Sequence, residues 1–186
     1  MRAALVVLLA CLLLAACGVD RAPEERANSA GIGLRYLRPQ DDSGFAKANE
    51  PRAFAFPSDH GSHPGYRAEW WYFTGNLESR DHGLYGFELT FFRVALRAAG
   101  RESPRASAWA SDQVWMAHLA ITDGVGRKFI ARERMGRAAL GIAGAWEDPV
   151  RVWVKSWSAT RQDGRPGERW QLSARDGDTG LEWALR

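Results

Sequence analysis

One stretch of this chain decides its fold, and it reads Arg67-Ala68-Glu69-Trp70-Trp71-Tyr72-Phe73-Thr74-Gly75-Asn76-Leu77. Four aromatic residues follow a glutamate without interruption, and bulky rings favour the pleated surface of a β-strand. Successive side chains of a strand point to opposite faces, so Trp70 and Tyr72 face one side while Trp71 and Phe73 face the other. Both faces are apolar, and the pattern therefore predicts a strand that is covered on both sides or lines an internal cavity.

The first residues have the pattern of a bacterial lipoprotein signal. A basic start precedes an apolar run over residues 3–16, which is too short to span a bilayer and is typical of a secretory signal. The run ends in small residues before Cys17, so we expect cleavage there and lipidation of its thiol; an ordinary signal with an incidental cysteine is the alternative. Residues 1–16 are the predicted signal peptide, and residues 17–49 the lipidated cysteine, tether and N-terminal arm. The acyl chains would anchor the protein to a membrane of the bacterial envelope, facing the periplasm.

Composition excludes several classes of protein. The chain has two cysteines, Cys11 inside the predicted signal and Cys17 at its end. The mature domain therefore has no thiol for a disulfide, a cysteine-bound metal or a nucleophile. The net charge of +3 is spread among aromatic and acidic residues without a basic stripe, so we expect no nucleic-acid partner. The remaining composition is that of an ordinary globular domain.

Beyond the tether, the sequence predicts β-structure almost throughout. Residues 41–66 are rich in turn-forming residues and predict an ordered loop, whereas 138–145 are small and glycine-rich and predict a helical turn or a loop. Segments with strand-like alternation predict strands over 68–78, 84–96, 114–122, 127–134, 150–160, 169–175 and 181–185. The fold class is therefore all-β, as a sandwich or an up-and-down antiparallel barrel.

The last residues, 181–186, alternate like a strand and then stop without a turn or a cap. A barrel strand without its neighbour leaves an exposed apolar edge. We therefore expect that the chain is truncated within its domain; pairing of the last strand elsewhere is the alternative.

Three segments carry a resemblance to a known family. The first segment covers residues 56–77 and runs from Phe56-Pro57-Ser58-Asp59-His60-Gly61 through Glu69-Trp70-Trp71-Tyr72. The second covers residues 85–93, Tyr85-Gly86-Phe87-Glu88-Leu89-Thr90-Phe91-Phe92-Arg93. The third covers residues 116–123, Met116-Ala117-His118-Leu119-Ala120-Ile121-Thr122-Asp123. They resemble the AttH-like, lipocalin-like family, which includes the carotenoid 1,2-hydratases (hydroxyneurosporene synthases). The resemblance covers about residues 50–186 and implies a lipocalin-like antiparallel β-barrel, the first of two tandem barrels and C-terminally truncated. The family's second domain, with its own acid- and Trp-containing motif, has no counterpart in this sequence.

The resemblance implies acid-catalysed addition of water to a terminal isoprenoid double bond. Such a reaction needs a carboxylic acid in a dry pocket and aromatic faces that stabilise a carbocation. We take Glu69, beside the aromatic run, and the pair Asp59 and His60 as catalytic candidates. The structural alternative for Glu69 is an ion pair with Arg67 or Arg93, because buried carboxylates usually have a charged partner.

Aromatic residues of several strands are candidates to line an apolar ligand site, because a barrel of this kind can enclose one small ligand. The candidate ligand-binding residues are Trp70, Trp71, Tyr72, Tyr85, Phe87, Glu88, Trp115 and His118. For His118, a place in the core or the lining of the barrel is the simpler interpretation. His60 and His63 have no third metal ligand nearby in sequence, so we predict no metal site. The hydration reaction that the resemblance implies needs no cofactor.

Two functions from different classes remain open. The first is a cofactor-independent hydratase that acts on an isoprenoid or another long apolar substrate. The second is a non-catalytic carrier, a lipoprotein that binds a lipid and cooperates with an ABC-type export system, an association that the resemblance also implies. The lipidation signal favours the carrier, and binding of an apolar ligand is common to both.

Overall fold

The computed structural model describes residues 42–79, 82–98, 100, 107–162, 169–177 and 179–185, all of which belong to one compact unit, Tyr36–Arg186. The predicted signal peptide, Cys17 and most of the tether lie outside the described residues. Apart from one short 3-10 helix, Ser58–His60, the described elements are β-strands, and the all-β fold class is confirmed. No helix in this part of the chain is long and apolar enough to cross a membrane.

The first sheet consists of four antiparallel strands in sequence order. They are β1 (Ala68–Glu78), β2 (Leu84–Ala95), β3 (Gln113–Asp123) and β4 (Lys128–Arg137), and all four lie where the sequence predicts strands. The register of β1 and β2 places Glu69 opposite Arg93 and Trp71 opposite Phe91. Because side chains alternate between the two faces, these four residues share the face that points to the interior.

The second sheet consists of five shorter antiparallel strands, also in sequence order. They are β5 (Ala143–Glu147), β6 (Val150–Val154), β7 (Trp157–Gln162), β8 (Arg169–Asp176) and β9 (Thr179–Leu185). The single strand predicted over 150–160 is wrong, because Lys155 has a left-handed conformation (φ 56°) and turns the chain between β6 and β7. The last residues of the segment 138–145 are strand rather than loop, since Ala143 pairs with Val154 of β6.

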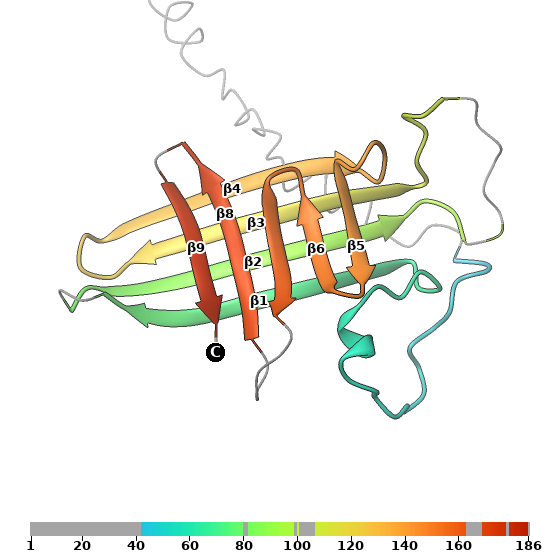
Figure 1. Ribbon diagram of the computed structural model, residues 1–186, viewed down its shortest axis with the longest axis horizontal. Coiled ribbons are helices and arrows are strands. Elements are labelled where there is room, and N and C mark those ends of the chain that lie inside the picture. The colour runs from blue at the N-terminus through green and yellow to red at the C-terminus, as the bar shows by residue number, and fades with distance from the viewer. Residues whose placement is uncertain are drawn as a thin grey trace, which may run out of the picture. The chain divides into compact units, whose positions relative to one another are not determined.

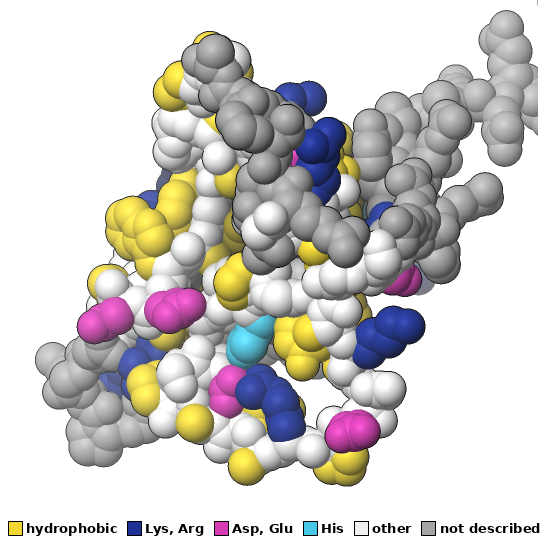
Figure 2. Space-filling model, turned by 90° about the vertical axis from the view of Figure 1, so that its right-hand side faces the viewer, with side chains coloured by type: hydrophobic (Ala, Val, Ile, Leu, Met, Phe, Trp, Pro, Cys, Tyr) yellow, Lys and Arg dark blue, Asp and Glu magenta, His cyan; other side chains and the backbone are white. Residues whose placement is uncertain are grey.

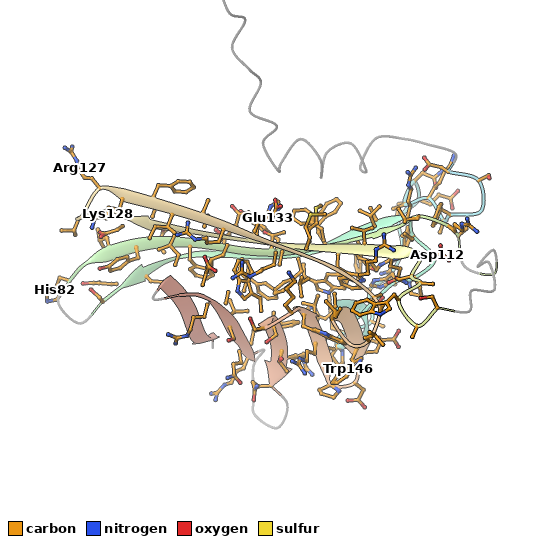
Figure 3. All side chains as sticks on the ribbon, turned by 90° about the horizontal axis from the view of Figure 1, so that it is seen from above. His82, Asp112, Arg127, Lys128, Glu133 and Trp146 are labelled. Atoms are coloured by element: carbon orange, nitrogen blue, oxygen red, sulfur yellow. The ribbon has the colours of Figure 1, made fainter. Side chains whose placement is uncertain are left out.

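The two sheets form separate layers that pack face to face. Figure 1 shows the strands of the second sheet crossing those of the first steeply, and Figure 3 shows the same sheets from above as two layers. Such steep crossing is one of the two common ways in which twisted sheets pack. The chain passes from β4 to β5 through residues 138–142, and the strand pairing of the described residues keeps the two sheets distinct.

Side chains fill the space between the sheets. The buried core consists of Phe87, Leu89, Phe91, Trp115, Ala117, Leu119, Ala143, Val152, Val154, Trp157, Ala159, Leu172 and Ala174. Trp71 and Phe73 pack against this core, but Trp70 and Tyr72 are 66% and 55% exposed on the opposite face of β1. The prediction that β1 is covered on both sides or lines an internal cavity is therefore wrong, because in a two-layer fold the second sheet covers only one face of the first and leaves Trp70 and Tyr72 exposed.

The segment before β1, residues 42–67, is an ordered loop, as predicted, and it lies against the first residues of that strand; we call it the entry loop. Within the loop, Ala46 N donates to Gly65 O over 2.9 Å. Trp71 Nε1 donates to His60 O, also over 2.9 Å, and so fixes the short helix to β1. At Gly61 a Cβ atom would lie 2.9 Å from Glu147 Cγ, so this position needs a glycine for the loop to pass close to β5.

Candidate functional site

A cleft of about 390 Å³ opens between the entry loop, the start of β1 and the start of β8. Its lining residues are Asp59, His60, Gly61, His63, Glu69, Trp70, Trp71, Tyr72, Phe73 and Trp170. Figure 2 shows the end of the molecule that carries the entry loop, where a histidine lies among acidic, basic and hydrophobic side chains. The cleft therefore combines an aromatic wall with a cluster of charged groups.

An ion pair between Glu69 and Arg93 joins β1 to β2 beside the cleft. Arg93 Nε donates to Glu69 Oε2 over 2.6 Å, and the Arg93 side chain is only 1% exposed. The Nη2 atom of Arg93 donates to the carbonyl oxygens of His63 (3.0 Å) and Tyr66 (2.7 Å). The structural alternative predicted for Glu69 is thus confirmed with Arg93, while Arg67 pairs with Asp42. The pair also holds the end of the entry loop in place.

His63 links two carboxylates across the cleft. Its Nδ1 atom lies 3.2 Å from Glu69 Oε1 and its Nε2 atom 3.1 Å from Asp59 Oδ1. The backbone N–H of His63 also donates to Glu69 Oε1 over 2.9 Å. Each carboxylate thus has hydrogen-bond donors within reach on the protein itself, which is the arrangement of a structural network.

Asp59 is held as a carboxylate by three neighbours. Arg52 Nη2 donates to Asp59 Oδ1 over 2.7 Å, and the backbone N–H of Ala55 donates to Oδ2. The Ala55 N–H, then the His63 imidazole and the Arg52 guanidinium, hold the pKa of Asp59 well below its ordinary value. An acid held in this way is a poor proton donor at neutral pH.

The aromatic wall of the cleft includes residues that are distant in sequence. The His60 ring lies 4.5 Å from the Phe56 ring and meets the Trp170 ring edge-on at 5.6 Å, centroid to centroid. Phe73 lies 5.1 Å from the same Trp170 ring. His60 is therefore part of an aromatic cluster, and the contacts between its rings add to their burial energy.

The structure brings six of the candidate site residues to the cleft: Asp59, His60, Glu69, Trp70, Trp71 and Tyr72. Phe87 and Trp115 are instead buried in the core, where Trp115 stacks on Trp71 at 5.8 Å. Tyr85 lines a separate hollow at the other end of β1 and β2.

Two further candidates, Glu88 and His118, lie on the outer face of the first sheet. Glu88 accepts a hydrogen bond from Thr90 Oγ1 (3.1 Å), and His118 Nε2 lies 3.0 Å from Glu133 Oε2. Figure 3 shows Glu133 on the side of the first sheet away from the second. The expected place of His118 in the core or the barrel lining is therefore wrong, because the register aligns it with Thr90 on the face of the first sheet that points away from the core.

Sequence reasoning did not assign three residues that shape the cleft: Arg52, Phe73 and Trp170. Arg52 orders the loop through Asp59, and Phe73 and Trp170 close the aromatic wall from two different sheets. The position of Phe73 in the aromatic run was a sequence signal that could have assigned it to the cleft. Trp170 gave no such signal, because only the packing of β8 near β1 brings its ring to Phe73. In the described part of the chain no group of three or more His, Cys, Asp or Glu residues is arranged to hold a metal ion.

Comparison with known proteins identifies the family. The AttH-like family model matches residues 47–186, so the chain belongs to the AttH-like family. The fold is similar to the crystal structure of a protein assigned as AttH from Nitrosomonas europaea, with 29% identity and a TM-score of 0.60 over 76% of this chain. The likeness confirms a lipocalin-like β-fold. This chain spans only 40% of the length of that protein. A search of curated proteins found no match to this chain.

Proposed function

We propose that this protein is an envelope lipoprotein that binds a long apolar ligand, a lipid or an isoprenoid, in the cleft at the start of β1 and carries it without chemical change. The observation that supports the proposal is the aromatic lining of the cleft, which follows the edge strand β1: Trp71 and Phe73 line it from the inner face of the strand, and the exposed Trp70 and Tyr72 from the outer face. Aromatic and apolar walls with a few polar groups are the usual lining of a small-molecule site.

The packing of the interior supports the cleft rather than the barrel lumen as the ligand site. Trp115 and Trp157, at 2% and 0% exposure, lie between the two sheets with the core residues around them. A close-packed interior does not accept a ligand without displacing side chains, which costs stability. The cleft needs no such rearrangement.

The charged groups support binding rather than hydration. Hydration of a double bond needs an acid that gives a proton to carbon, whereas Glu69 is paired with Arg93 and Asp59 with Arg52. The same groups suit the polar end of an amphipathic ligand, whose apolar chain would lie along the aromatic wall. An ABC-type exporter remains the proposed partner of such a carrier, and the lipidation signal at Cys17 supports its place on the membrane.

The test is to purify the full chain from bacterial membranes and to analyse its bound molecules by mass spectrometry, followed by incubation with lycopene and with oleic acid. We expect a co-purified lipid, and a ligand of unchanged mass after incubation. Trp70→Ala should weaken binding by about tenfold, a loss of about 1.4 kcal/mol. Phe129→Ala is the matched control, because this exposed aromatic residue lies at the opposite end of the first sheet.

Two results would overturn the proposal. A gain of one water by lycopene that Glu69→Gln abolishes would identify a hydratase, with circular dichroism to verify that the variant folds. Equal loss of binding in Trp70→Ala and Phe129→Ala would place the ligand elsewhere. The membrane location is tested separately, since Cys17→Ser should release the protein into the soluble fraction.

A further inference from the structure

A pair of tryptophans, the exposed Trp146 and the half-buried Trp153, lies on the outer face of the second sheet, and neither residue lines the cleft. Trp146 of β5 is 50% exposed, and Figure 3 shows it pointing away from the first sheet. Its ring meets that of Trp153 on β6 at 4.9 Å in a T-shaped arrangement. These two rings are named the Trp146–Trp153 platform.

The platform is held in a defined position by the backbone around it. Trp153 Nε1 donates to Gly141 O over 2.9 Å. A Cβ atom on Gly144 would lie 2.8 Å from the six-membered ring of Trp153, so the ring lies directly on the β5 backbone. A side chain at position 144 would lift this ring, and the absence of one keeps it flat against the sheet.

Arg151 places a cation between the two rings. Its guanidinium carbon lies 5.5 Å from the Trp146 ring centroid and 5.3 Å from that of Trp153, within the range of cation–π attraction. Its Nε atom is buried and has no hydrogen-bond partner among the described residues. A buried donor without a partner costs free energy, which the contacts of the guanidinium with the two rings help to offset.

The neighbouring strands continue this face with hydrogen-bonding side chains. Thr160 on β7 lies opposite Arg151, and Gln171 on β8 lies opposite Thr160. In the next row, Ser158 lies between Trp153 and Ser173. Gln162 Nε2 donates to Gln171 Oε1 over 3.1 Å, which orders the end of the row that contains Arg151 and Thr160.

The described side chains of this face carry positive charge. Leu172 and Ala174 are buried, so the alternation of β8 puts Arg169 and Arg175 on the outer face with Arg151. Glu147, the acid next to Trp146, lies against Gly61 and the entry loop. One acid on β9, Glu182, lies opposite Ser173 by register, on the far side from the tryptophans. The charge therefore favours an anionic ligand near the platform.

We propose that the outer face of the second sheet binds an acidic glycan, a chain of pyranose rings that carries carboxylate groups. The apolar face of a sugar ring stacks on the exposed Trp146 ring of the platform, which Trp153 supports from the side, because tryptophan offers a large rigid surface with little conformational entropy to lose. Arg151 binds the carboxylate of the same sugar with its planar fork of donors. The hydroxyl and amide side chains of β7 and β8 bind the hydroxyl groups of the next sugars along the chain.

The test measures binding of the full chain to oligogalacturonate, oligoalginate and heparin oligosaccharides. Maltohexaose and cellohexaose serve as neutral sugars, and polyglutamate as a polyanion without sugar rings. We expect at least one acidic glycan to bind about tenfold more tightly than the neutral sugars and polyglutamate. Trp146→Ala and Arg151→Gln should each weaken that binding by about tenfold. Binding of the apolar ligand in the cleft should stay unchanged in both variants.

Trp109→Ala provides the matched control, because Trp109 is 60% exposed but lies in the connection between β2 and β3. Absence of binding to every acidic glycan would overturn the proposal. If polyglutamate bound as tightly as the acidic glycans, the face would be a basic patch that does not recognise sugar rings. If the neutral sugars bound as tightly, Arg151 would not recognise a carboxylate. Equal loss in Trp109→Ala would show that the platform is not the site.

Discussion

The space between the two sheets and the cleft at the start of β1 are built from the same kinds of residue but differ in packing. In the interior, Trp115 and Trp157 are almost completely buried and other core side chains surround them. At the cleft, Trp70 and Tyr72 remain more than half exposed on the outer face of β1, and the ion pair of Glu69 and Arg93 lies on its inner face. The interior therefore holds the two sheets together, and the cleft retains surface that a ligand can cover.

The strand β1 belongs to both regions at once. Its alternate residues Trp71 and Phe73 point to the core, and the residues between them point to solvent. One aromatic run thus gives the fold its stability with one face and offers a binding surface with the other. An aromatic-rich strand is consequently no proof of an internal ligand cavity, because alternation divides its rings between two environments.

The largest effect is expected from removal of a core tryptophan. Trp157→Ala should lower the free energy of unfolding by about 3–5 kcal/mol, because it leaves a cavity between the sheets and removes the hydrogen bond from Nε1 to Arg175 O. Urea unfolding followed by circular dichroism measures the change. The exposed Trp109 is the control, for which alanine should cost less than about 0.5 kcal/mol. A loss below about 1 kcal/mol for Trp157→Ala would mean that the interior is loosely packed.

The next effect concerns the ion pair beside the cleft. Arg93→Met should lower the free energy of unfolding by about 3–5 kcal/mol, because it leaves the carboxylate of Glu69 without its buried partner. The double variant Arg93→Met with Glu69→Leu should lose less than the single one, since no unpaired charge remains. Chemical unfolding of both proteins tests this order.

Arg132→Gln is the control for that experiment, because Arg132 pairs with Asp176 where both side chains are partly exposed. Such a pair contributes little in water, so the variant should stay close to the wild type. If both arginine variants lost the same stability, burial would not distinguish the two pairs.

A smaller effect on the free energy of unfolding is expected when the pH is lowered. The pKa of Asp59 is lowered in the folded protein, so its contribution to stability is fully present above the ordinary carboxyl range and is lost as the pH falls towards the folded pKa. Unfolding experiments between about pH 5 and pH 2 should therefore show a decline that is less steep in Asp59→Asn than in the wild type. The same decline in both proteins would assign the acid sensitivity to other carboxylates.

The smallest effect on stability is expected at the cleft surface. Trp70→Ala should change the free energy of unfolding by less than about 0.5 kcal/mol, because its ring is 66% exposed. The same variant should reduce binding of the apolar ligand, so stability and binding separate at this residue. A large loss of stability would show that Trp70 belongs to the packed region.

Much of the fold was predictable from local pattern. The bounds of β1 and the position of β2 followed from aromatic alternation and from the turn residues between them. The division of residues 150–160 into two strands was missed, because a lysine with positive φ gives no sequence signal of a turn. In the cleft, the motif that contains Asp59 and Glu69 was found, but the sequence left open which arginine pairs with Glu69.

The sequence by itself determined the β-class, the family and the local segments that supply the cleft, because these depend on alternation and on motifs of neighbouring residues. The tertiary structure alone decided that Trp70 and Tyr72 face solvent and that Trp170 joins the aromatic wall. It also decided that Arg93 neutralises Glu69, and that Trp146, Trp153 and Arg151 meet on one outer face. These facts depend on which sheet covers which face and on strand register, and both are set by contacts between residues far apart in the chain.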